Sequence, residues 1–165
     1  MKIIWRLILL GVVAAAAVWL WTIFFPDPQQ VIRKQLATVA REVSVKPNQS
    51  PLVTVGNAHR LANSFSTNVQ VRLEVPGGGE HTFTSREEIA QAATAALAAI
   101  HGLKVQFLDV NVTLGPDRQS AVADLTLKAE RPGDPELNVQ EMKFTFQKIG
   151  GHWLITRVET VRTLS

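Results

Sequence analysis

The sequence predicts an α+β protein in which one apolar helix precedes a single compact domain. The chain has 165 residues, a length typical of one domain with an appendage. A run of nineteen residues, from Leu7 to Phe25, carries no charge. After this run, helix-capping signals alternate with apolar–polar strand patterns, and Gly- and Pro-rich turns separate the last strands.

The uncharged run is long enough to cross a membrane as a helix. At about 1.5 Å per residue it extends roughly 28 Å, close to the thickness of the hydrocarbon layer. Lys2 and Arg6 precede it and Asp27 follows it, so the positive-inside rule predicts a cytoplasmic N-terminus.

These flanks predict the organisation of the whole chain. We expect residues 1–26 to form a basic cytoplasmic tip and an anchor in the inner (cytoplasmic) membrane, with residues 3–25 in contact with the bilayer. Residues 27–165 then form a periplasmic or otherwise extracytoplasmic domain. A cleaved signal peptide with small residues at 14–17 is the alternative, and it places the domain on the same side.

Composition excludes several classes of function. The net charge is +3, but without Lys2 and Arg6 the chain has 15 basic and 14 acidic side chains, so we expect no nucleic-acid partner. The absence of cysteine excludes disulfides and thiol catalysis. The four histidines lack the spacing of metal-binding pairs, so we predict no metal site and no cofactor.

Three segments begin with capping signals and predict helices. Asp27-Pro28 starts a helix that runs to about residue 44, and Ser50-Pro51 starts a second that runs to about residue 64. Ser85-Arg86-Glu87-Glu88 is a capping box that starts a third, which ends near His101. The expected buried faces are Ile32, Leu36, Val39 and Val43; Leu52, Val55, Ala58, Ala62 and Phe65; and Ile89, Ala92, Ala93, Ala96, Leu97 and Ile100.

Alternating patterns predict six strands. Residues 69–75 and 81–84 flank the first glycine-rich turn, and four strands follow the third helix, at about 104–114, 121–131, 138–148 and 153–162. Short turns between the last four predict an antiparallel meander. The adjacent apolar residues Phe107 and Leu108 interrupt the alternation and predict a β-bulge near Asp109.

This order of elements resembles the nuclear transport factor 2-like (SnoaL-like) superfamily. The closing segment Gly150-Gly151-His152-Trp153-Leu154-Ile155-Thr156-Arg157-Val158-Glu159 is similar to the final hairpin of that family. The resemblance covers roughly residues 28 to 163. It implies a cone in which three helices pack on a curved, mainly antiparallel sheet, with Phe65, Leu97, Phe107, Phe144 and Trp153 as pocket-lining residues. It also implies that outer-face sheet residues, among Val122, Thr126, Phe144, Phe146 and Trp153, form a homodimer interface.

Two functional hypotheses follow, because one fold hosts many functions. The first is a membrane-anchored, non-catalytic binding or assembly module whose partner is a second copy or another envelope protein. The second is a small-molecule lyase, isomerase or carrier that uses the cone pocket. Its catalytic candidates are His59, Asp109 and Asp124, which would have to converge in the cone. The chain has no tyrosine, which weakens the analogy with isomerases of the family.

Overall fold

The computed structural model describes residues 11–12, 14–16, 19, 27–75, 79–133 and 138–161. Within these ranges, no helix is long and apolar enough to cross a membrane. Most of the expected anchor falls outside them, since only residues 11–12, 14–16 and 19 of the run from Leu7 to Phe25 are described.

Three helices form where the capping signals predict them. α2 spans Pro28–Val43, α3 spans Pro51–Asn63 and α4 spans Arg86–Ala99. Asp27 caps α2 by accepting a hydrogen bond from the main chain of Gln29. Ser85 caps α4 through the amide of Glu88, and the Glu88 carboxylate accepts from the amide of Thr84, so the predicted capping box is confirmed.

Six strands form one curved, mixed sheet. They are β1 (Phe65–Val75), β2 (Gly79–Phe83), β3 (Lys104–Leu114), β4 (Ser120–Glu130), β5 (Asn138–Ile149) and β6 (His152–Thr160), in the order β2-β1-β6-β5-β4-β3. The predicted antiparallel meander of β3 to β6 is confirmed. β1 pairs with β6 in parallel, which joins the first hairpin to the end of the meander.

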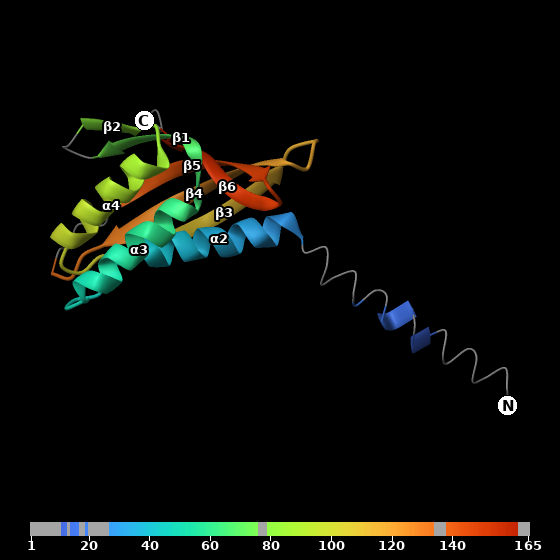
Figure 1. The fold of residues 1–165 in the computed structure, drawn as a ribbon, viewed down its shortest axis with the longest axis horizontal. Coiled ribbons are helices and arrows are strands. Elements are labelled where there is room, and N and C mark those ends of the chain that lie inside the picture. Colours follow the sequence, from blue (N-terminus) through green and yellow to red (C-terminus); the bar gives the residue numbers. More distant parts are fainter. Residues whose placement is uncertain are drawn as a thin grey trace.

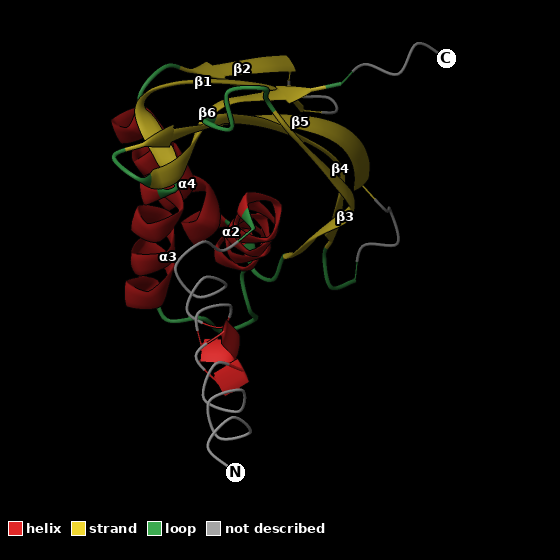
Figure 2. Cartoon of the chain, turned by 90° about the vertical axis from the view of Figure 1, so that its right-hand side faces the viewer, coloured by secondary structure: helices red, strands yellow, loops and turns green. Residues whose placement is uncertain are grey.

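The helices lie on the concave side of the sheet (Figures 1 and 2). α2 runs beside β3, whereas α3 and α4 pack mainly on each other and close the other side. Apolar side chains of β4 and β5, including Ala123, Leu125 and Phe144, point inward and are buried. Ile32 and Leu36 of α2 are fully buried against this sheet face, so the core lies between the sheet and the helices.

The predicted buried face of α3 is wrong at its first turn. Leu52 is 81% exposed and Val55 is 38% exposed, whereas Thr54 and Leu61 are buried. Thr54, Ala58, Leu61 and Ala62 also repeat with helical spacing, and this neighbouring stripe faces the core instead.

The predicted β-bulge near Asp109 is confirmed. The register of β3 against β4 shifts between Leu108 and Asn111. Asp109 has a positive φ of 52°, a left-handed conformation that aspartate tolerates better than most residues.

Candidate functional site

A cavity of about 300 Å³ lies between the helices and the concave face of the sheet. Every helix and every strand of the described domain contributes to its wall. The lining residues are all apolar: Val39, Val43, Leu61, Phe65, Val71, Leu73, Phe83, Ile89, Ala92, Ala93, Ala96, Leu97, Val105, Phe107, Leu127, Met142, Phe144 and Val158. The cavity therefore has the volume of a small-ligand site but none of the polar groups that usually orient a ligand.

The alanines of α4 leave room for this cavity. Ala92, Ala93 and Ala96 belong to the expected buried face of this helix. α4 packs mainly on α3, and the three methyl groups border the open space. Ala96 is also exposed to solvent, so the cavity opens along this side of α4.

Four of the five predicted pocket-lining residues line this cavity. They are Phe65, Leu97, Phe107 and Phe144, and the rings of Phe107 and Phe144 lie 5.7 Å apart in a tilted arrangement. Trp153 is buried elsewhere, beside Ser64 and Gly151 in a separate depression. It pairs with Lys148 next to the β5–β6 turn, at the opposite end of β6 from the cavity residue Val158.

The three catalytic candidates do not meet in the cavity. His59 is exposed on α3. Asp109 and Asp124 are brought together, but on the outer face of the sheet, where both line a depression of about 280 Å³. Asp124 forms an ion pair of 3.8 Å with Lys143 on the same face. The cluster that the enzyme hypothesis requires is therefore not formed in the cone.

The structure also separates the sheet residues suggested for a dimer interface. Phe144, Phe146 and Trp153 are buried on the inner side of the sheet, so they cannot take part in an outer-face contact. Val122 and Thr126 lie on the outer face and are half-buried.

The sequence pattern did not reveal Leu61, Ala96 and Met142 as cavity residues. Ala96 belongs to an expected buried helix face, whereas Leu61 lies outside the face expected for α3. Nothing in a single sequence distinguishes a side chain that fills a core from one that borders a void. The run of small residues on α4 was the one available signal.

The titratable group with the most unusual environment lies outside the cavity. The Glu42 side chain is buried between α2 and α3, and this desolvation raises the pKa of its carboxyl group despite the nearby cations Arg60 and Arg41. In the described ranges, no three histidine or carboxylate side chains lie together as metal ligands would.

Comparison with known proteins shows the fold alone. No protein-family model matches the sequence, and no curated protein matches it. An NTF2-like protein with a cystatin-like fold from Novosphingobium aromaticivorans superposes with a TM-score of 0.62 at 19% identity, covering 89% of this chain and 86% of that one. A domain of unknown function with a cystatin-like fold from Nostoc punctiforme gives 0.64 at 17% identity, over 86% and 80% of the two chains.

A third solved structure agrees. An NTF2-like protein of unknown function from Pseudomonas putida has a TM-score of 0.63 at 8% identity, covering 83% of this chain and 87% of that one. The chain therefore has the NTF2-like, cystatin-like fold, and the cone expected from sequence is confirmed. Because one fold hosts many functions, the similarity to these structures assigns no function to this chain.

Proposed function

We propose that the domain is a non-catalytic binding module or carrier that takes a small, uncharged apolar molecule into the cone cavity. The observation that supports this is the chemistry of the wall, in which all the lining residues are apolar. A wall of this kind favours apolar ligands, because water beside it finds no hydrogen-bonding partners.

The same wall argues against the lyase or isomerase alternative. Such reactions need a side chain that donates or accepts a proton within hydrogen-bond reach of the substrate. The lining contains none, and His59, Asp109 and Asp124 lie outside the cavity.

Met142 offers a direct test, because the chain has only two methionines and Met142 lines the cavity. The full chain, labelled with ¹³C at the methionine methyl groups, is titrated with naphthalene in a neutral detergent. We expect a saturable shift of the Met142 signal, with the Met1 signal as an internal control.

A pair of neighbouring substitutions shows whether the ligand enters the cavity. Ala96→Phe places a ring in the mouth, whereas Ala95→Phe puts the same ring on an exposed position of α4 outside the lining. Ala96→Phe should abolish the Met142 shift and Ala95→Phe should preserve it. Equal responses of the two variants, or no shift in the original chain, would contradict the proposal.

We also propose that residues 3–25 anchor the domain to the inner membrane, with the domain on the extracytoplasmic side. The support is the uncharged run Leu7–Phe25 with Lys2 and Arg6 on one side and Asp27 on the other. The chain should stay with membranes during carbonate extraction, and a C-terminal alkaline phosphatase fusion should be active. Release by carbonate would refute the anchor.

A further inference from the structure

A second recess, which shares only Val105 and Phe107 with the lining of the cone cavity, lies between α2 and the edge strand β3. This groove has a volume of about 450 Å³. Its lining consists of Arg33, Leu36, Ala37, Ala40, Arg41, Ser44, Lys104, Val105, Gln106, Phe107 and Val110. The lining thus combines an apolar floor with three cations and contains no carboxylate.

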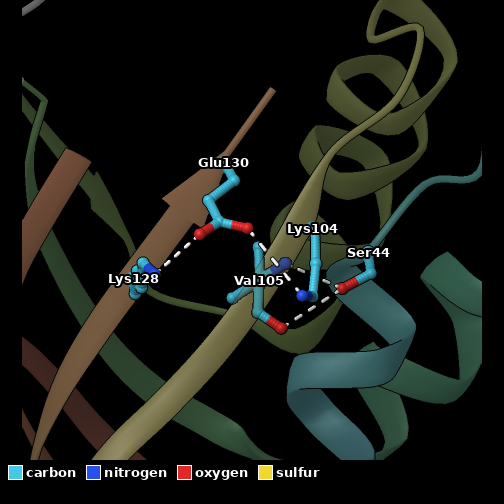
Figure 3. A network of polar contacts seen from close by, with 5 residues as sticks. All are labelled: Ser44, Lys104, Val105, Lys128 and Glu130. Carbon is cyan, nitrogen blue, oxygen red and sulfur yellow. Dashed lines mark hydrogen bonds and ion pairs between the residues drawn. The ribbon is translucent and has the colours of Figure 1, made fainter. Parts of the chain in front are cut away.

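Arg33 of α2 and Ser44, the residue that caps its C-terminus, bond to the edge of β3 at the two ends of the groove. Near one end, the Ser44 hydroxyl accepts a hydrogen bond from the Val105 amide at 2.9 Å (Figure 3). At the other end, Arg33 donates to the carbonyl of Val110. Between these anchors, Ala37 and Ala40 present only methyl groups toward the strand, which leaves space above Phe107.

Neither arginine of the groove forms an ion pair among the described residues, although Arg41 lies near enough to Glu42 to lower the pKa of that carboxyl group. Arg41 donates to the hydroxyl of Thr38, and Arg33 is bound to a neutral carbonyl. Glu42, the carboxylate next to Arg41 in sequence, forms its ion pair with Arg60 of α3.

The third cation, Lys104, forms only a long ion pair with the carboxylate of Glu130. Glu130 lies 2.7 Å from the ammonium of Lys128 but 3.8 Å from that of Lys104 (Figure 3). The hydrogen bond from Lys128 is also the main cause that lowers the pKa of Glu130. Lys104 therefore leaves positive charge at the end of the groove where Arg41 lies.

The spacing of the charges selects the shape of a complementary ligand. Arg33 and Arg41 are eight residues apart, which separates their backbones by about 12 Å along the helix. In an extended chain, residues four apart lie on the same face and are separated by about 13 Å. We propose that the groove between α2 and β3 binds an extended acidic segment of a partner protein, with carboxylates four residues apart over Arg33 and Arg41 and apolar side chains between them.

The proposal is tested by the binding of short labelled peptides to the full chain in neutral detergent, followed by fluorescence anisotropy. The first peptide has two aspartates four residues apart with valines between them, and the second has the same composition with adjacent aspartates. The first should bind more tightly, because adjacent residues of an extended chain point to opposite faces.

Two variants of α2 provide the matched comparison. Arg41→Gln should weaken binding about tenfold, the loss expected for one charge-assisted contact. Lys34→Gln removes an equal charge from an exposed position of the same helix outside the groove, and should change binding less than about twofold.

Three results would overturn the proposal. One is equal binding of the two peptides, and another is an equal effect of the two substitutions, which would indicate attraction by net charge alone. The third is tighter, Arg41-dependent binding of a soluble short-chain phosphatidylglycerol, which would assign the groove to a lipid headgroup.

Discussion

The carboxylate of Glu42 on α2 is paired through one oxygen with Arg60 on α3, at 3.5 Å from the guanidinium Nε. Its other oxygen, Oε2, is buried and has no hydrogen-bonding partner in the described part of the chain. Arg60 is itself 60% exposed at its side chain, so solvent screens the pair from one side. The contact between the two helices therefore contains a charge whose desolvation is incompletely compensated.

Glu42→Gln should stabilise the domain at neutral pH, and its advantage should grow as the pH rises. Burial raises the pKa of Glu42 in the folded state, so the folded state favours the protonated carboxyl. That stabilising contribution is complete below the pKa of the unfolded chain, near 4.5, and is lost as pH rises through the higher folded pKa. Glutamine is neutral throughout.

Urea unfolding across this pH range measures the effect. Glu87→Gln, which removes an exposed carboxyl from α4, serves as the control and should show no such trend. A Glu42→Gln variant less stable than the original chain at pH 8 would show that the ion pair with Arg60 outweighs desolvation.

Ser85→Ala should destabilise the domain by about 1 kcal/mol, a typical value for loss of an N-cap. At the start of α4, the Ser85 hydroxyl accepts a hydrogen bond of 3.2 Å from the amide of Glu88. Ser50 occupies the same position before α3 but makes no capping bond through its side chain. Thermal unfolding of Ser85→Ala and Ser50→Ala should therefore differ, and equal losses would contradict the structural assignment of the caps.

Gly102→Ala should cost more stability than Gly133→Ala. Both glycines have positive φ, 82° and 84°, so each substitution incurs the left-handed penalty of about 1–2 kcal/mol. A methyl group at Gly102 would also approach Pro132 Cγ to 2.9 Å, whereas no atom of the described residues lies within 4 Å of one at Gly133. Denaturant midpoints for the two variants isolate the Pro132 contact, and identical midpoints would show that the proline moves away freely.

Local signals predicted most of the fold, because caps, turns and alternation act over a few residues. The starts of all three helices, the bulge at Asp109 and the meander of β3 to β6 follow from such patterns. The parallel pairing of β1 with β6 joins segments more than eighty residues apart, and no short-range pattern encodes it.

The site was less predictable because it depends on which of two equivalent faces turns inward. The apolar stripe through Leu52 and Val55 and the neighbouring one through Leu61 have similar helical spacing, and only the packed neighbours of α3 distinguish them. Asp124 would have to point into the cone to act as a catalytic group, but it lies on the outer face of the sheet.

The orientation of α3 gives a further prediction. Leu61→Ala should destabilise the domain by about 2–5 kcal/mol, because Leu61 is buried in the core and also lines the cavity. Leu52→Ala, nine residues earlier on the same helix, removes a side chain that is 81% exposed and should change stability by less than about 0.5 kcal/mol. A larger loss of stability for Leu52→Ala than for Leu61→Ala would instead support the buried face of α3 that was predicted from sequence.

The junction of α2 with β3 yields the last prediction. The Ser44 hydroxyl donates to Ala40 at 2.7 Å and accepts the amide of Val105 at 2.9 Å, so it joins the end of the helix to the edge strand. Ser44→Ala leaves that amide without its partner and should cost about 1–2 kcal/mol. Amide hydrogen exchange should accelerate at Val105 more than at Leu103, whose amide bonds the Val45 carbonyl at 2.7 Å. Equal acceleration at both amides would mean that this end of β3 opens as one unit. The hydrogen bond to Ser44 would then not be what specifically protects the Val105 amide.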